Sequence, residues 1–203
     1  MTEPAGDNRG AEAAERAAVD RALMGRVQAG DEAALGALME RWELPVKALI
    51  ARIVLNAGEA EELAQETFVR VWQQRERFRA GAEFRPWFFS IAANLARNRL
   101  RWWRRRPTVE LHEWSETEDG GRRVDDRGPM GGAEALERAE RAAAVRDAIA
   151  VLPADLREAI VLFEYEDLSH AQIGMAVGAT PKAVETRIYR ASEKLRAALQ
   201  RWV

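Results

Sequence analysis

The helical periodicity of this chain stops between Pro107 and Ala133, and this interruption limits the possible fold more than any other feature of the sequence. The segment holds five glycines and two prolines, with seven acidic residues against three arginines. Glycine and proline break helices, and an excess of like charges keeps a segment extended. The sequence therefore predicts two helical domains joined by a flexible acidic linker. The predicted boundaries are an N-terminal extension over 1–21, a first domain over 22–106, the linker over 107–135 and a second domain over 136–203.

Composition favours helices over strands in both domains. Alanine, leucine, arginine and glutamate dominate, and the chain is 47% hydrophobic and 32% charged, a balance typical of globular proteins. These residues are strong helix formers, whereas runs of β-branched residues are few. We therefore expect an all-α protein whose second domain has four short helices. In the first domain, helix breaks are expected at Gly30, near Pro45, at Asn56–Gly58 and across Arg77–Phe84.

The sequence also excludes several classes of function. It contains no cysteine and only two histidines, His112 and His170, so we expect neither a disulfide framework nor a zinc cluster. No nucleophile with a paired base and no phosphate-binding glycine loop is recognisable, so we expect no enzymatic activity and no cofactor. The longest apolar runs are about five residues, whereas a membrane span needs about 20. Because the N-terminus is also polar, we expect a cytoplasmic protein that does not insert into membranes.

Residues 169–191 carry the signals of a helix-turn-helix. Ser169 with Gln172 forms a capping box, Gly178 supplies the turn, and Thr180 before Pro181 caps the second helix. A basic second helix could be an ordinary solvated face, but these signals favour one that enters the major groove of DNA. Its candidate DNA contacts are Lys182, Glu185, Thr186, Arg187 and Arg190, of which Glu185 could instead pair with a neighbouring arginine.

The helix predicted from Pro86 to Arg106 combines aromatic residues with an arginine run. Six arginines lie between Arg97 and Arg106 with no acid among them, which suits a phosphate backbone. We predict a buried stripe that includes Trp87 and Trp102. Phe89 and Trp103 are predicted to project outward, where stacking on unpaired bases contributes about 1–3 kcal/mol per base. The candidate nucleic-acid contacts of this helix are Trp87, Phe89, Ser90, Asn94, Arg97 and Arg101.

The preceding helix, predicted over Glu59–Gln74, has a buried stripe and an opposite polar ribbon. The ribbon carries carboxylates, an amide and one central aliphatic side chain, a combination that suits a protein partner better than DNA. Ordinary solvated surface explains the same pattern, and the pattern alone does not decide between the two. The candidate residues of this ribbon are Glu62, Gln65, Glu66 and Val69.

Three blocks of the chain, taken in order, carry a family resemblance. They are residues 60–72 (AEELAQETFVRVW), residues 84–96 (FRPWFFSIAANLA) and residues 152–195. These blocks resemble the core-binding helix, the promoter-melting helix and the −35 reading region of the sigma-70 family. Within that family, the chain is most similar to the compact extracytoplasmic-function (group IV) sigma factors. The resemblance covers residues 23–106 and 136–199.

The resemblance implies a role for each surface. It assigns Glu62, Gln65 and Glu66 to the clamp helices of the largest polymerase subunit. It assigns Asn94 to a flipped base of the −10 element, with the loop Arg77–Phe84 shaping the base pocket. The basic helix after Thr180 corresponds to the −35 reading helix, and the acidic linker to a segment that threads towards the polymerase active centre. The implied partners of this monomer are core RNA polymerase, promoter DNA and an anti-sigma factor.

Two departures from the family pattern limit what is carried over. Arg85 and Pro86 stand where the family usually has a small hydroxyl pair, and Lys182 and Glu185 stand where many members have a small residue and a base. The alternative function is an autonomous helix-turn-helix regulator, with the first domain used for dimerisation or ligand binding. That alternative explains residues 169–190 equally well, but it gives no role to a second basic, aromatic-rich helix.

Overall fold

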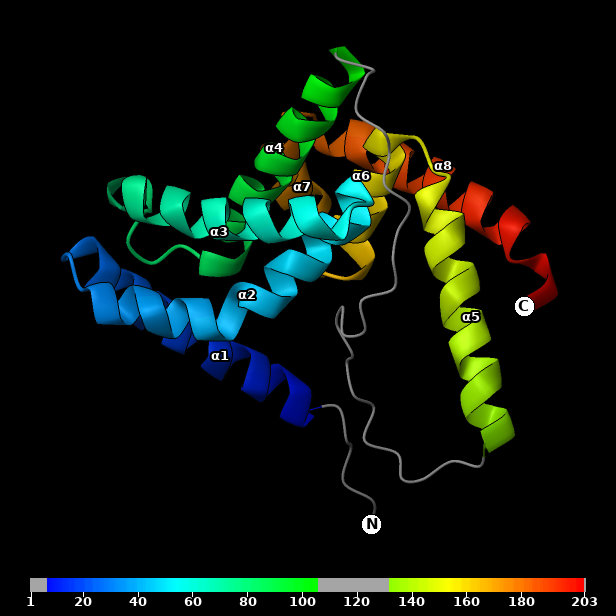
Figure 1. Ribbon diagram of the computed structural model, residues 1–203. Helices are drawn as coiled ribbons and strands as arrows, with labels where there is room; N and C mark the ends of the chain where they lie inside the picture. The colour runs from blue at the N-terminus through cyan, green and yellow to red at the C-terminus, as the bar shows by residue number, and fades with distance from the viewer. Residues whose placement is uncertain (1–6, 106–131, 203) are drawn as a thin grey trace.

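The computed structural model describes residues 7–105 and 132–202, and all regular structure within those residues is helical (Figure 1). The N-terminal half contains α1 (Asp7–Gln28), α2 (Glu32–Val54), α3 (Ala57–Gln73), the short 3₁₀ helix η1 (Arg75–Arg77) and α4 (Phe84–Arg105). The C-terminal half contains α5 (Gly132–Ala150), α6 (Ala154–Glu164), α7 (His170–Val177), α8 (Pro181–Ala198) and η2 (Gln200–Trp202). The prediction of an all-α fold is confirmed. Among the helices so described, none has the length and apolarity needed to cross a membrane.

Local caps explain most of the helix boundaries in the N-terminal half. Gly30 adopts a positive φ of 89° between α1 and α2, and Asp31 then accepts the Ala34 amide at 3.1 Å. Arg26 donates to the Asp31 carboxylate, and this hydrogen bond with the cap itself lowers the pKa of Asp31. At the next boundary the Asn56 side chain accepts the Glu59 amide at 2.9 Å. The predicted breaks at these two positions are confirmed.

The predicted break near Pro45 is wrong, because Pro45 lies inside α2. Proline cannot donate to the carbonyl four residues earlier, which costs a helix interior about 3 kcal/mol. The helix nevertheless continues, since the following turn buries Val46, Leu49 and Ile50 completely. Tertiary packing of an apolar face outweighs this local penalty. Figure 1 shows α2 changing direction partway along its length, as expected at an internal proline.

The core of the N-terminal half is built around the aromatic side chains of α4. Phe84, Phe88 and Phe89 meet Trp42 of α2 with ring centroids 6.0, 5.8 and 5.5 Å apart. Helix α4 packs against α1, α2 and α3, and it also packs against α7 of the other half. Because helices contact it from several sides, α4 is buried over a much wider arc than one stripe.

The C-terminal half places α6, α7 and α8 together, and α5 extends away from them (Figure 1). The capping box is present, with the Ser169 hydroxyl accepting the Gln172 amide at 3.3 Å and the Gln172 side chain accepting the Ser169 amide at 2.8 Å. Gly178 is left-handed at φ 67° and Thr180 caps α8. The predicted helix-turn-helix signals are therefore confirmed.

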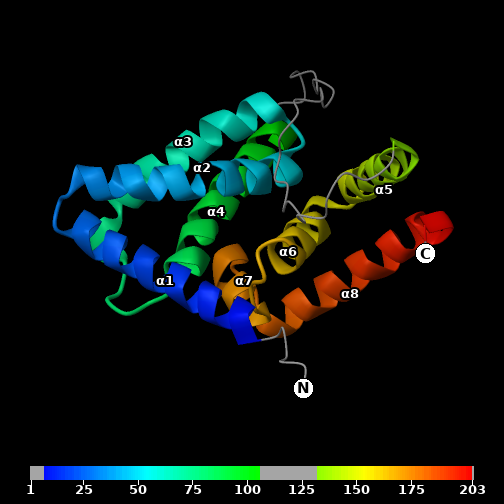
Figure 2. The ribbon, with the colours of Figure 1, turned by 90° about the horizontal axis from the view of Figure 1, so that it is seen from below.

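The two halves pack on one another. Helix α7 lies against α4 and α6 lies against α2, and both ribbon views show these elements adjacent (Figures 1 and 2). Most of the predicted linker, together with His112, lies outside the described residues. Within them, α1 begins at Asp7 and α5 at Gly132, so the predicted N-terminal extension is largely helical and the last residues of the predicted linker belong to α5.

Candidate nucleic-acid interface

The polar stripe of α4 is formed by Ser90, Asn94, Arg97 and Arg101, as the sequence predicts. Asn94 and Arg101 are exposed, whereas Ser90 and Arg97 are half-buried. The Asn94 carbonyl oxygen accepts a hydrogen bond from Nη1 of Arg97 at 3.1 Å. Asn98 accepts one from Nη2 of Arg101 at 2.7 Å. Side-chain amides one helical turn away therefore orient two guanidinium groups of this stripe.

The aromatic residues of α4 are placed differently from the prediction. Phe89 is 0% exposed and belongs to the core, so the prediction that it projects outward to stack on bases is wrong. Trp103 packs against the core, whereas Trp102, predicted to be buried, is 43% exposed. Trp87 is half-buried at the edge of the core, with its ring centroid 5.1 Å from that of Phe78. Because neighbouring helices cover a wide arc of α4, Phe89 and Trp103 pack inward where outward positions were predicted.

Arg97 is engaged by an acid that sequence reasoning did not single out. Its Nη2 lies 2.8 Å from Oε1 of Glu158 in α6, and its Nε lies 3.2 Å from both carboxylate oxygens. Glu158 is 4% exposed. Burial raises the pKa of Glu158, and the hydrogen bonds from Arg97 act in the opposite direction. No local sequence pattern links these residues, which are 61 positions apart.

The polar ribbon of α3 lies beside a groove shared with α4. Glu62, Gln65 and Val69 are exposed, and Glu66 pairs with Arg70 at 2.7 Å. Arg99 of α4 pairs with Glu59 and lies 3.7 Å from Glu62. The groove measures about 690 Å³ and combines apolar with charged side chains. Its lining is Glu62, Leu63, Glu66, Leu95, Asn98, Arg99 and Trp102.

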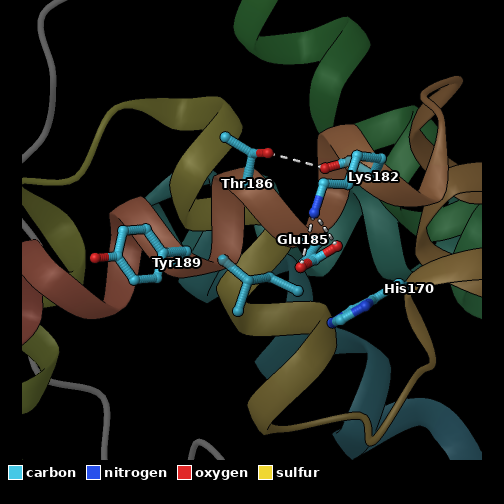
Figure 3. Close-up of a pocket in the computed structure, with 6 residues that line it drawn as sticks. His170, Lys182, Glu185, Thr186 and Tyr189 are labelled. Carbon is cyan, nitrogen blue, oxygen red and sulfur yellow. Dashed lines mark hydrogen bonds and ion pairs between the residues drawn. The ribbon is translucent and has the colours of Figure 1, made fainter.

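The first turns of α8 expose most of the predicted DNA contacts. Lys182, Glu185, Thr186 and Arg190 are exposed, and Arg187 is half-buried. Figure 3 shows Lys182 paired with Glu185, with 3.0 Å between Nζ and Oε2. The Thr186 hydroxyl donates to the Lys182 carbonyl at 2.9 Å, and Arg187 lies 3.8 Å from Asp155. In this structure Glu185 thus pairs with a lysine, not with an arginine.

Two further residues border this face of α8 and were not among the candidates. Tyr189 is 66% exposed, and His170 lies beside Phe163 with their ring centroids 5.4 Å apart. Together with Lys182, Glu185 and Thr186 they line a shallow groove of about 440 Å³ (Figure 3). Tyr189 follows Glu185 by one helical turn, so its position on the exposed face could have been recognised from the sequence.

Gly174 holds the helix-turn-helix together through a close backbone approach. A Cβ atom at this position would lie 2.6 Å from the carbonyl oxygen of Ala179, which is backbone and cannot move independently. Real Cβ atoms do not approach so closely, so only glycine fits here. This requirement depends on the fold of the turn, and the sequence gives no separate signal for it.

The family models identify both halves of the chain. A model of sigma-70 region 2 matches residues 38–106, and a model of sigma-70 region 4 matches residues 142–195. The RNA polymerase sigma-H factor of Pseudomonas aeruginosa is 34% identical over 186 residues, which cover 89% of this chain and 94% of that protein. This chain belongs to the sigma-70 family. It is an RNA polymerase sigma factor, and the sigma factor's promoter-directed role in transcription initiation follows from that membership.

Other relatives place this sigma factor in the extracytoplasmic-function group. The ECF RNA polymerase sigma-E factor of Haemophilus influenzae is 34% identical over 183 residues, covering 89% of this chain and 95% of that protein. The structure of CnrH in complex with the cytosolic domain of CnrY matches with a TM-score of 0.62 and 26% identity, covering 90% of this chain and 97% of CnrH. The sigma factor RpoE of Bartonella quintana, solved with the anti-sigma factor NepR, shares the fold at a TM-score of 0.58 and 21% identity, over 81% of this chain and 97% of that one. A stand-alone helix-turn-helix regulator is not favoured, because region 2 and region 4 both match.

Proposed function

We propose that this sigma factor uses three separate surfaces for its three tasks. The ribbon Glu62, Gln65, Glu66 and Val69 binds core RNA polymerase, the polar stripe of α4 opens the −10 element, and the first turns of α8 read the −35 element. The observation that carries the proposal is the exposed, oriented Asn94 beside the arginines of α4, in a chain that also exposes a helix-turn-helix. A protein that only reads duplex DNA has no use for the α4 stripe.

Asn94 is suited to hold an unpaired base. A carboxamide both donates and accepts hydrogen bonds, so it can read the edge of a base that has left the stack. Ser90 lies one turn earlier, and its hydroxyl donates to the Trp87 carbonyl at 2.6 Å. Arg97 and Arg101 lie further along the same stripe, where guanidinium groups neutralise phosphates. Phe89 is not part of this proposal, because its ring is buried.

The recognition face of α8 combines base readers with phosphate contacts. Side chains on the first turns of such a helix reach base edges, whereas arginines further along contact phosphates. The Lys182–Glu185 pair leaves both side chains at the surface, with 80% and 51% of them exposed. Tyr189 extends the face by one turn. Contacts of Lys182 and Glu185 with base edges require their mutual ion pair to rearrange on binding, which costs little at an exposed site.

The α3 ribbon is supported as a polymerase dock by its composition and by the groove beside it. Val69 is exposed among polar neighbours, and Leu63, Leu95 and Trp102 line the groove. An acidic rim around a partly apolar groove suits a basic, amphipathic helix of a protein partner.

We also propose that an anti-sigma factor controls this sigma factor, as in the Bartonella quintana complex, and that this partner contacts both domains. We place the sigma factor in the cytoplasm and assign it no enzymatic activity.

Gel filtration with and without core RNA polymerase tests this proposal. The purified chain should elute as a monomer and should comigrate stoichiometrically with added core enzyme. An obligate dimer that ignores core polymerase would overturn the proposal and would restore the autonomous regulator.

A further inference from the structure

Helix α8 presents to solvent a ridge of side chains that is separate from its arginines. The buried side of the helix is formed by Val184, Ile188 and Ala191. The ridge lies on the opposite side, and its members are all exposed: Lys182, Glu185, Thr186 and Tyr189. Arg187 and Arg190 lie together along one flank of this ridge. A helix in the major groove reaches base edges from such a ridge, whereas flanking arginines suit phosphates.

The first two turns of the ridge carry an ion pair between Lys182 and Glu185 (Figure 3). The lysine Nζ lies 3.1 Å from Oε1 and 3.0 Å from Oε2 of the glutamate. The hydroxyl of Thr186 already donates its only proton to the Lys182 carbonyl. An ammonium group has three donors and a carboxylate has about four lone-pair sites, so both members of the pair keep capacity for a further partner.

Helix stability does not account for the position of this pair. Lys182 lies in the first turn of α8, where the helix dipole disfavours a positive charge. An acid that precedes a base is the stabilising order along a helix, and here the base comes first. The pair is also exposed, so it contributes little to folding. Recognition of a ligand explains a position that stability leaves unexplained.

The major-groove edge of a C·G base pair is complementary to this ion pair. Cytosine presents its N4 amino donor, and the O6 and N7 acceptors of guanine follow beside it. A carboxylate can accept from N4 while an ammonium group donates to O6 or N7. An A·T pair fits less well, because adenine places the N7 acceptor beside its N6 donor, where it repels a carboxylate. Thymine then offers one acceptor next to a methyl group.

We infer that Lys182 and Glu185 act together as a reader of one C·G base pair in the −35 element. The carboxylate of Glu185 accepts from cytosine N4, and Lys182 donates to the guanine of the same base pair. One carboxylate oxygen keeps its contact with Lys182 while the other accepts from the base, so the two charges stay neutralised in the groove. The inference rests on the proposed −35 role of α8 and names the base pair selected at the two positions where this chain departs from the family pattern.

A promoter selected from genomic DNA of the native host, then randomised across its −35 region, tests this reader. The complex of the full chain with core RNA polymerase should select C·G strongly at one position. Glu185→Gln replaces the carboxylate by an amide, which suits the N6 and N7 edge of adenine. This variant should lose about tenfold of the preference for C·G over A·T at that position, with adenine gained in place of cytosine.

Glu193→Gln is the matched control for the loss of a negative charge. Glu193 is an exposed acid two turns beyond Glu185, and it also pairs with a base three residues later, Arg196. A general effect of charge on DNA binding appears in both variants. The change of base preference should appear in Glu185→Gln alone.

Joint action of the two side chains is tested by a double-mutant cycle. Lys182→Met removes the ammonium group and keeps the aliphatic stem, and it should also lower the preference for C·G about tenfold. Independent contacts would give an about hundredfold loss in the double variant Lys182→Met with Glu185→Gln. If the pair acts as one reader, the double variant should lose much less than that.

The outcomes distinguish the inference from the proposed function. No C·G preference in the unmodified chain, the same preference in Glu185→Gln, or additive losses in the cycle would each overturn the inference. The proposed −35 role of α8 would still stand if Arg190→Ala weakened promoter binding at every −35 sequence. If Arg190→Ala also left binding unchanged, the proposed −35 role would fail and the inference with it.

Discussion

Arg97 of α4, which is half-buried, and the buried Glu158 of α6 form an ion pair across the two halves of the chain, with 2.8 Å between Nη2 and Oε1. Burying two charges costs solvation, and the pair returns that cost only while both partners stay in place. The raised pKa of Glu158 shows that burial outweighs the attraction for its carboxylate. Such a pair adds little net stability. In this structure it holds the Arg97 guanidinium against a carboxylate.

The salt dependence of promoter binding tests whether Arg101 contacts a phosphate. Arg101 is exposed and, among the residues that the structure describes, its side chain donates to Asn98, which leaves its guanidinium accessible to phosphate. We predict that Arg101→Ala weakens promoter binding by the holoenzyme uniformly across sequences and reduces the slope of log affinity against log salt by about 1. Filter binding at several salt concentrations measures the slope. An unchanged slope would remove Arg101 from the DNA contacts.

The packing of the two halves on one another should depend on pH through Glu166. Burial raises the pKa of Glu166 to about 7, against the attraction of Arg85 and Arg52 and together with the repulsion of Asp167. Because the pKa of Glu166 is raised when the two halves are packed together, protonation of Glu166 stabilises the packed form. This stabilisation is complete below the ordinary pKa of the carboxyl and is lost as the pH rises through about 7. The fraction of molecules in which the two halves are packed together should therefore fall as the pH rises from about 4.5 to about 7. Distances between spin labels on Glu76→Cys and Lys194→Cys, exposed positions in different halves, measure that fraction, and Glu166→Gln should flatten the curve. A pH dependence that survives in Glu166→Gln would assign the effect to another group.

Gly174 provides a stability prediction with an internal control. Gly174→Ala forces a Cβ to within 2.6 Å of the Ala179 carbonyl oxygen, so the turn must shift. We expect a loss of about 1–3 kcal/mol in the free energy of unfolding, the usual cost of overpacking. Gly36→Ala, within α2 and with no atom within 4 Å of the added Cβ, should instead be neutral or stabilising. Urea denaturation compares the two, and equal effects would contradict the close approach.

What the sequence could predict depended on how local the cause was. Ser169, Gln172 and Thr180 cap their helices through hydrogen bonds to residues three positions away, so their roles could be predicted from the sequence. The burial of Phe89 was not, because a helical wheel assumes one buried stripe and α4 is contacted by α1, α2, α3 and α7. The Arg97–Glu158 pair could not be predicted for a related reason. It depends on how the two domains pack together, and the sequence around neither residue indicates that packing.

The polymerase dock is tested by reversing its charge at Glu66. Glu66→Lys combined with Gln65→Ala should weaken core binding at least tenfold while leaving the helix content unchanged, because both side chains lie outside the core stripe of α3. A rim charge of this kind acts mainly on the association rate and its salt dependence. Surface plasmon resonance with immobilised core enzyme measures both. Glu76→Lys, an exposed acid outside the ribbon, is the control. Equal affinity for the two variants would contradict the dock.

Permanganate footprinting of a promoter in the presence of core polymerase tests the central claim most directly, because the reagent modifies thymines that have left the duplex. With the unmodified chain, reactivity should appear in the −10 region only when both the chain and core polymerase are present. Asn94→Ala should abolish most of that reactivity while the closed promoter complex still forms, since its side chain is exposed and its loss leaves the core intact. Unchanged reactivity in Asn94→Ala, or −10 reactivity produced without core polymerase, would contradict the account.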